Sequence, residues 1–346
     1  MTDIPTSMWA LVVKGPGDGA IETIAVPQPG PGSIVVRVID VLLYKTTPAF
    51  FDGANAAAGM TLPYPLVFGG AAVGRVAATG PDTTAFDLGQ LVLIEPNLRA
   101  RDDPNKAVVW GGFDGFDPRT KQFVKDNWCD GSWAEYTRDL LHLGYLPVLY
   151  AGLGRIDVKA GETVLICPAT GIFSNGAIAV ARALGLNVIA GGRNAESLDA
   201  LKARFPGIQT IQLKGEQEDS SAIQALGPID AFVDVGPAAA TGTSYLASCI
   251  LSVRKGGRVC LIGGRGDATL PVPYPFLMFN NITLRGSLMY DDEDVKRLLK
   301  LAESGILKLD VEGGLGVLAS YPLEDYAKAL EKAKSCAKGK IVVVNP

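Results

Sequence analysis

Histidine and paired cysteines are nearly absent from this sequence. One histidine occurs in 346 residues, and the five cysteines are scattered without a Cys-x-x-Cys pair. Zinc in proteins is held by thiolate, imidazole or carboxylate groups, so this composition argues against a zinc centre built from His and Cys. An odd number of dispersed cysteines also argues against a disulfide framework and indicates a reduced, cytoplasmic protein.

Excess positive charge, long apolar runs and a leader pattern are also lacking. The net charge is −4, which argues against a nucleic-acid or anionic-membrane partner bound by bulk electrostatics. No uninterrupted apolar segment is long enough to cross a bilayer. Residues 1–13 lack the basic start and the apolar core of a signal peptide. With 48% hydrophobic and 20% charged residues, the chain can bury a sizeable core.

The stretch from residue 161 to residue 194 is the most informative part of the chain. Thr163–Cys167 is a short apolar run without alternation, as expected of a strand buried on both faces of a parallel sheet. A turn at Ala169–Gly171 follows, then a helix from about Ser174, then a second strand at Val188–Ala190. This order predicts the first half of a dinucleotide-binding βαβ unit, whose helix N-terminus faces a pyrophosphate.

The glycine motif in this unit is incomplete. In place of Gly-x-Gly-x-x-Gly the chain has Ala169, Thr170 and Gly171, followed by Ser174. Gly171 keeps the position where the backbone approaches phosphate, and the Ser174 hydroxyl can cap the helix or bind a phosphate. An ordinary strand-to-helix turn is the alternative interpretation, but the placement between a strand and a helix favours nucleotide binding.

The end of the second strand predicts which cofactor is bound. NAD-binding proteins of this kind carry Asp or Glu about 20 residues after the glycine turn, where it binds the ribose 2′-hydroxyl. This chain has Gly192 there, followed by Arg193 and Asn194. Glycine leaves room for a 2′-phosphate, Arg193 offers it a planar fork and Asn194 a further donor. We therefore predict NADP(H), the alternative being a simple turn with an exposed arginine.

The chain has two regions that differ in their pattern of predicted strands and helices. Residues 1–145 read mostly as short strands, with a long irregular stretch from Glu95 to Trp133. After residue 150 strands and helices alternate, which predicts a parallel sheet with crossovers. The predicted strands of this region are Thr163–Cys167, Val188–Ala190, Thr210–Leu213, Ala231–Val235, Arg258–Ile262 and Ile282–Leu288, and the predicted helices after it are Asp291–Ser304 and Pro322–Ala337. The fold class is therefore α/β, a Rossmann doubly wound parallel sheet plus a mostly β domain.

An ordered set of motifs runs through nearly the whole chain. Its parts are residues 27–32, 65–76, 131–136, 161–194, 256–263 and 339–343. This set resembles the medium-chain dehydrogenase/reductase superfamily, and within it the zinc-independent members that are fungal alcohol dehydrogenase-like or quinone oxidoreductase-like. The resemblance implies a GroES-like catalytic domain at 1–145, completed by 290–346, and a Rossmann nucleotide-binding domain at 146–289. It also implies a homodimer that pairs through the last Rossmann strand.

The resemblance also points to catalytic positions. Zinc-dependent relatives hold the metal at positions that match Tyr44, Gly70, Ala71 and about Leu143, and none of these residues binds zinc well. The chain is therefore expected to be metal-free. Tyr44, in place of the first ligand, and Thr46, in place of a proton-relaying Ser/Thr, become the candidates for stabilising or protonating a substrate oxygen. Packing by Tyr44 and turn capping by Thr46 are equally open interpretations.

Three further positions complete the predicted cofactor site. Lys45 matches a basic residue that contacts the pyrophosphate in relatives, a solvated lysine being the alternative. Gly236 and Gly263 follow two predicted strands of the Rossmann domain and are assigned to the same site. Asp130, Asp234 and Asp291 are expected to be turn or cap residues.

Together these features predict an NADPH-dependent oxidoreductase that transfers hydride to a carbonyl or an enone of an apolar small molecule. Its substrate pocket is expected between the domains, lined by residues 44–60 and 95–130 and by the apolar Tyr274–Phe279, which could equally form a subunit interface. The alternative is a protein that binds NADP(H) without redox turnover, either a regulator or a non-redox enzyme.

Overall fold

The chain divides into two compact units. The computed structural model describes residues 4–54, 56, 60–100, 103, 106–111, 113–139, 146–215, 218–266, 269–270, 272–308, 316–336 and 340–346. The first unit consists of residues 1–144, 317–336 and 341–346, and the second of residues 145–316 and 337–340. Residues 290–316 thus fall in the second unit, whereas the sequence assigned them to the first. The reason is that helix α9 (Asp292–Glu303) packs against α3 (Leu146–Arg155).

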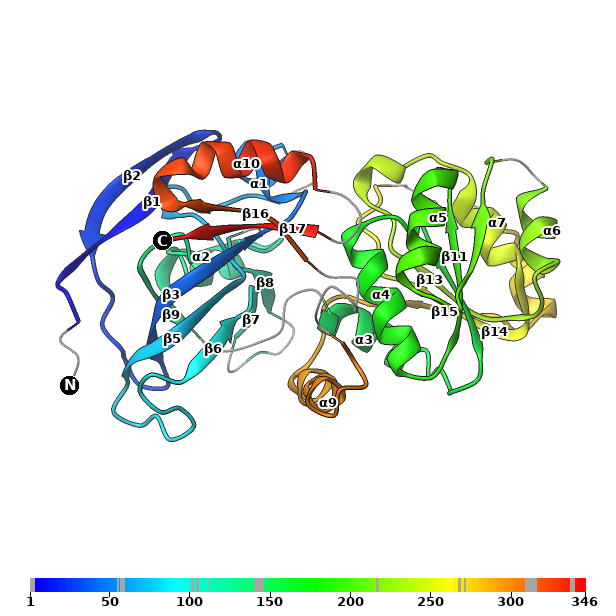
Figure 1. The fold of residues 1–346 in the computed structure, drawn as a ribbon, viewed down its shortest axis with the longest axis horizontal. Coiled ribbons are helices and arrows are strands. Elements are labelled where there is room, and N and C mark those ends of the chain that lie inside the picture. Colours follow the sequence, from blue (N-terminus) through cyan, green and yellow to red (C-terminus); the bar gives the residue numbers. More distant parts are fainter. Residues whose placement is uncertain are drawn as a thin grey trace. The chain divides into compact units, whose positions relative to one another are not determined.

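The second unit, coloured green to orange in Figure 1, is built on a parallel sheet. The sheet has six strands in the order β12-β11-β10-β13-β14-β15. Its strands are β10 (Thr163–Cys167), β11 (Asn187–Gly192), β12 (Gln209–Gln212), β13 (Ile229–Asp234), β14 (Val253–Leu261) and β15 (Thr283–Gly286). Every neighbouring pair is parallel, so the predicted doubly wound sheet is confirmed. Strand β10 lies in the centre and is almost entirely buried, as its apolar run predicted.

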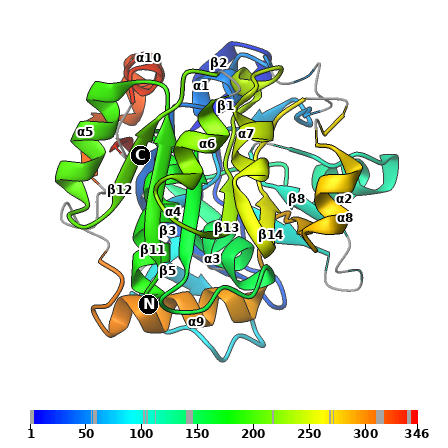
Figure 2. The same ribbon diagram turned by 90° about the vertical axis from the view of Figure 1, so that its right-hand side faces the viewer.

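Helices cover both faces of this sheet (Figure 2). The helices of this unit are α3, α4 (Ile172–Ala183), α5 (Ala195–Arg204), α6 (Asp219–Gln224), α7 (Tyr245–Leu251), α8 (Tyr274–Phe279) and α9, which packs on α3, with a 3-10 turn at Ala238–Ala240. The strand order runs one way from β10 to β12 and the other way from β13 to β15. Right-handed crossovers therefore place α4 and α5 on one face and α7 on the other. Ligands of such sheets bind at the carboxyl ends of the strands where the order reverses, here β10 and β13.

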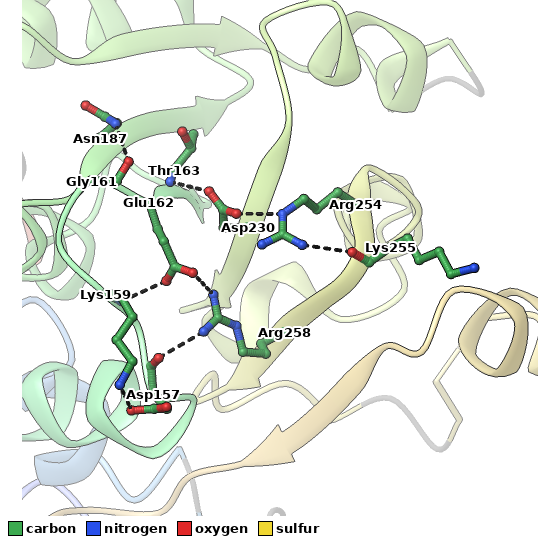
Figure 3. A network of polar contacts seen from close by, with 10 residues as sticks. All are labelled: Asp157, Lys159, Gly161, Glu162, Thr163, Asn187, Asp230, Arg254, Lys255 and Arg258. Atoms are coloured by element: carbon green, nitrogen blue, oxygen red, sulfur yellow. Dashed lines mark hydrogen bonds and ion pairs between the residues drawn. The ribbon is translucent and has the colours of Figure 1, made fainter.

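A polar network holds the opposite, amino-terminal edge of this sheet (Figure 3). Glu162 pairs with Arg258 at 2.7 Å, and the Asn187 side-chain amide donates to the Gly161 carbonyl at 2.9 Å. Asp230 joins β13 to β10 by accepting a backbone N–H bond at 2.7 Å. These groups lie away from the carboxyl ends of the strands, so the network is structural.

The first unit is mainly β-sheet. Strand β3 is central in a sheet of order β16-β17-β3-β5-β6, to which β9 also pairs, and further sheets have the orders β2-β1-β4 and β7-β8. The elements are β1 (Ser7–Gly15), β2 (Asp18–Ala25), β3 (Ile34–Leu43), α1 (Thr47–Phe51), β4 (Leu66–Val67), β5 (Ala72–Thr79), β6 (Leu91–Ile94), β7 (Asn97–Arg99), β8 (Ala107–Val109), α2 (Pro118–Asn127), β9 (Tyr136–Asp139), β16 (Gly316–Pro322), a 3-10 turn at Leu323–Asp325, α10 (Tyr326–Lys334) and β17 (Lys340–Asn345). Its core gathers alternate residues of these strands around Phe68 and Trp133.

Several element boundaries differ from those that the sequence predicted. The stretch from Glu95 to Trp133 is not irregular throughout, because it contains β7, β8 and the ten-residue helix α2. The carboxylate of Asp117 caps α2, and Pro118 takes its first position, a signal that could have predicted this helix. Asp291 caps α9 in a capping box, as expected. No described helix is both long and apolar enough to cross a membrane.

Candidate functional site

The carboxyl ends of four parallel strands meet at one edge of the sheet in the second unit. Backbone bonds join the segments that leave them: Ala169 N–H donates to the Gly191 carbonyl at 2.7 Å, and Gly263 N–H donates to that of Asp234 at 3.1 Å. This edge carries every predicted cofactor residue except Lys45, namely Ala169, Thr170, Gly171, Ser174, Gly192, Arg193, Asn194, Gly236 and Gly263. The topology therefore brings residues from four separate stretches of sequence into one cluster.

Gly171 stands at the start of helix α4. It is the N-cap residue, with φ −87° and ψ 173°, and no side chain caps the helix. Since Gly171 is the N-cap, the helix begins at Ile172, two residues before the start that the sequence predicted at Ser174. A Cβ atom on Gly171 would meet only the Ser174 hydroxyl, at 3.6 Å, so packing inside the protein does not require glycine here. An uncapped helix N-terminus with an exposed glycine is suited to the close approach of an anion.

The Ser174 hydroxyl is used within the turn itself. It donates to the Pro168 carbonyl, and the residue is 2% exposed. The hydroxyl proton is thus engaged inside the turn, and the expected roles of Ser174 in capping the helix or binding a phosphate stay predictions.

The end of β11 lies against the glycine turn. A Cβ atom on Gly192 would come within 3.5 Å of the Thr170 methyl group, so these two positions are neighbours. The Arg193 side chain is exposed beside them. Asn194 caps α5, because its side-chain oxygen accepts from the Ser197 N–H at 2.7 Å. Only the NH2 group of Asn194 is left for the predicted role as a phosphate donor.

The ends of β13 and β14 surround a buried acid. A Cβ atom on Gly263 would lie 2.5 Å from the Gly236 carbonyl oxygen, so the close approach of these segments requires glycine. Asp234 is 3% exposed. Its carboxylate accepts from the Gly236 N–H at 3.1 Å, which makes Asp234 the turn residue that the sequence predicted. It also accepts from the Tyr245 hydroxyl at 2.6 Å. Burial raises the pKa of Tyr245, and the neighbouring carboxylate raises it further, so Tyr245 stays a neutral donor. Sequence reasoning missed this pair.

The catalytic candidates lie in the first unit, between β3 and α1. The Thr47 hydroxyl accepts from the Tyr44 N–H at 2.9 Å, and the Thr47 N–H donates to the Tyr44 carbonyl at 3.0 Å. Thr46 is the N-cap residue of α1, but its side chain makes no cap bond, so the capping interpretation does not account for it. Lys45 and Thr46 are exposed and Tyr44 is half-buried. Thr47, absent from the predicted site, makes both of these bonds to Tyr44.

The positions that match zinc ligands do not fit a metal. A Cβ atom on Gly70 would lie 2.7 Å from the Trp110 carbonyl oxygen, so a histidine side chain has no room there. Ala71 is 5% exposed and has no donor atom in its side chain. Leu143 lies outside the described residues. Within the described part of the chain, no cluster of three or more His, Cys, Asp or Glu side chains could hold a metal ion.

Two domain families match the chain. Residues 30–139 match the alcohol dehydrogenase GroES-like domain, and residues 174–304 match the family described as zinc-binding dehydrogenase. The first match covers most of the strands of the first unit, and the second begins in helix α4 and ends in the region of α9.

Relatives and solved structures extend along nearly the whole chain. Sorbitol dehydrogenase of Bacillus subtilis is 25% identical over 346 residues, covering 95% of this chain and 94% of its own. Acryloyl-coenzyme A reductase of Sulfurisphaera tokodaii is 22% identical, covering 98% and 100%. The short chain alcohol dehydrogenase of Escherichia coli CFT073 with NADH superposes with a TM-score of 0.77 at 16% identity, covering 99% of this chain and 100% of that one. At this identity the structural likeness shows the fold.

Proposed function

Because the chain belongs to the medium-chain dehydrogenase/reductase superfamily, we propose that it is an NADPH-dependent, metal-free oxidoreductase that reduces a carbonyl or an enone of an apolar small molecule. The two relatives act, by name, on sorbitol and on acryloyl-coenzyme A. One is named a dehydrogenase and the other a reductase, so together they leave carbonyl and C=C reduction open.

The observation that carries the proposal is the pair Gly192 and Arg193 beside the glycine turn. The acid that would bind a ribose 2′-hydroxyl is missing, and an exposed guanidinium takes its place. A hydrogen bond to a charged group contributes about 1.5–3 kcal/mol. At about 1.4 kcal/mol per decade, one such bond gives a preference of roughly 10- to 100-fold for NADPH over NADH.

Different residues of the chain would bind the cofactor and protonate the substrate. The N–H groups at the start of α4 would hold the pyrophosphate, with Lys45 as a further cation, and Arg193 would hold the 2′-phosphate. The reduced nicotinamide, when bound, supplies a hydride to the electrophilic carbon. The electron pair displaced onto oxygen, or onto the α-carbon of an enone, takes one proton, which we assign to Tyr44 or Thr46.

The metal-free part of the proposal rests on the residues themselves. Tyr44, Gly70 and Ala71 offer no imidazole, thiolate or carboxylate, and the Trp110 carbonyl closes the space beside Gly70. Hydrogen-bond donors must then stabilise the charge that develops on the substrate oxygen, which is why a hydroxyl at Tyr44 or Thr46 matters.

We further propose a homodimer built on the second unit. Helix α8 has no buried residue, and its Tyr274 and Phe279 are 75% and 69% exposed. Among the described residues, strand β15, which follows it, lies at the edge of the sheet and pairs with β14 on one side only. A two-fold pairing of β15 with its copy would cover both features. The same apolar residues are the alternative candidates for lining the substrate pocket.

The test of the proposed function is a substrate panel. The protein would be incubated with NADPH, a chelator and a series of ketones, quinones and enones, while the absorbance of the reduced nicotinamide is followed. We expect substrate-dependent oxidation of NADPH that the chelator does not reduce. Tight NADPH binding without oxidation by any class of substrate would favour the alternative function, a nucleotide-binding regulator or a non-redox enzyme. Activity that appears only with added zinc would contradict the metal-free mechanism.

A further inference from the structure

Asn175 connects two helices to the glycine turn. It lies in α4, four residues after Gly171, and is 1% exposed. Its side-chain NH2 donates to the Gly171 carbonyl at 2.6 Å. Its side-chain oxygen accepts from the Arg204 guanidinium at 2.7 Å, and Arg204 ends helix α5. The buried side-chain amide of Asn175 therefore links Arg204 at the end of α5 to the Gly171 carbonyl at the start of α4.

This contact fixes the orientation of one peptide group. The Gly171 carbonyl also accepts from the Asn175 backbone N–H at 3.0 Å, so two donors of the same residue hold it. The peptide unit is planar, so the direction of this carbonyl sets the opposite direction of the N–H on Ile172. That N–H is the first of the helix donors that have no partner within the helix, and such donors bind anions.

The Asn175–Arg204 contact lies next to the glycine turn, and it places a partly buried cation there. Thr170, Ser197 and Arg204 line a small hollow together with Asn175, between the glycine turn and α5. Burial lowers the pKa of the Arg204 guanidinium, so placing this cation here costs free energy, which its bond to Asn175 helps to offset. An apolar side chain at position 204 could fill the same space without this cost, so the charge of Arg204 points to a role beyond packing.

We propose that Asn175 and Arg204 are positioning residues that aim the Ile172 N–H at the pyrophosphate of the bound dinucleotide. They act through the Gly171 peptide and do not touch the cofactor. This inference rests on the proposed function insofar as the turn binds a nicotinamide dinucleotide. It does not depend on the preference for NADPH, because the pyrophosphate is common to NADPH and NADH.

The test compares dissociation constants for both nucleotides in matched variants. Asn175→Leu removes both side-chain bonds, and Asn175→Asp keeps an acceptor for Arg204 but turns a carboxylate oxygen toward the Gly171 carbonyl. We expect both variants to raise the Kd of NADPH and of NADH by the same factor, roughly 2- to 10-fold, which corresponds to one hydrogen bond of about 0.5–1.5 kcal/mol. Turnover at saturating nucleotide should not change, so the effect should appear in the KM for the nucleotide and not in kcat.

Asn187→Leu is the matched control, because it breaks the same kind of bond, from an Asn amide to the Gly161 carbonyl, at the opposite edge of the sheet (Figure 3). Its Kd values should equal those of the unmodified protein. Unchanged Kd values in folded Asn175→Leu would overturn the inference, as would an equal loss in Asn187→Leu, which would indicate general loosening of the unit.

A third variant keeps the test decisive if the Asn175 variants do not fold. Arg204→Lys retains the charge but loses the planar fork, and the same parallel rise in both Kd values is expected. No rise in this variant would overturn the inference. Equal affinity of the unmodified protein for NADPH and NADH would contradict only the proposed cofactor preference, and the common factor could still be measured. Failure of the unmodified protein to bind either nucleotide would overturn both.

Discussion

The carbonyl oxygen of Trp110 lies 2.7 Å from the position that a Cβ atom on Gly70 would take. A backbone oxygen cannot rotate away as the end of a side chain can, so any larger residue at position 70 must displace the chain around Trp110 or around itself. Position 70, which the family resemblance matches to a zinc ligand, therefore has no space for a larger side chain in this packing.

Gly70→Ala should consequently destabilise the protein, although the substitution adds only a methyl group. We expect a loss of about 1–3 kcal/mol in the free energy of unfolding, measured by urea titration. Gly15→Ala is the matched control in the same unit, because a Cβ atom there meets nothing within 4 Å. Equal stability of the two variants would show that the contact at Trp110 relaxes without cost.

Metal content gives an independent prediction. Protein purified without chelator should contain far less than one zinc per chain by elemental analysis, because Tyr44, Gly70 and Ala71 cannot replace the usual ligands. Stoichiometric zinc would contradict the metal-free proposal and would require ligands other than these three.

Replacement of Arg193 should separate the two nucleotides. Arg193→Ala is expected to raise the Kd of NADPH by roughly 10- to 100-fold and to leave that of NADH nearly unchanged, because the lost bond goes only to the 2′-phosphate. Arg182→Ala is the control, since Arg182 is an exposed arginine in the last turn of α4. A parallel loss for both nucleotides would mean that Arg193 acts on a part that they share.

The sequence predicted the βαβ unit well because its signals are local. A central parallel strand must be apolar on both faces, so Thr163–Cys167 is visible as an unbroken run, and the glycine turn and helix follow directly. The pairs Asn175–Arg204 and Gly70–Trp110 join residues far apart in the chain, and no periodicity says which of many polar groups or glycines will meet. Helix α2 is different, because its Asp117-Pro118 start was present but lay in a stretch rich in Asp and Gly.

The catalytic proposal predicts a specific kinetic signature. Tyr44→Phe or Thr46→Val, whichever removes the proton donor, should lower kcat by roughly 10²- to 10⁴-fold, the usual contribution of a positioned acid or base. The Kd of NADPH should not change in either variant, which serves as the internal control for folding. Full turnover in both variants would assign the proton to another group or to water.

The contact between Tyr245 and Asp234 should contribute to stability in a pH-dependent manner. Tyr245→Phe leaves the buried carboxylate with one donor fewer, so we expect a loss of about 1.5–3 kcal/mol at neutral pH. The folded-state pKa of Tyr245 is raised, so its contribution is fully present below the unfolded-state value of about 10 and is lost as the pH rises above it. The difference between the two proteins should therefore shrink above that pH. Tyr274→Phe, at a tyrosine that is 75% exposed in the single chain, should show no such pH-dependent difference.

The proposed dimer can be tested on its apolar surface. Phe279 is 69% exposed on α8, next to the edge strand β15, and burying such rings is a main source of association energy. Phe279→Asp should place an unpaired charge in the interface and shift the protein from dimer to monomer in sedimentation velocity. Phe116→Asp, at an even more exposed phenylalanine of the first unit (77%), is the matched control and should leave the dimer intact. If Phe279→Asp instead leaves the dimer intact but weakens substrate binding, α8 lines the substrate pocket, which is the alternative that the apolar run at 274–279 left open.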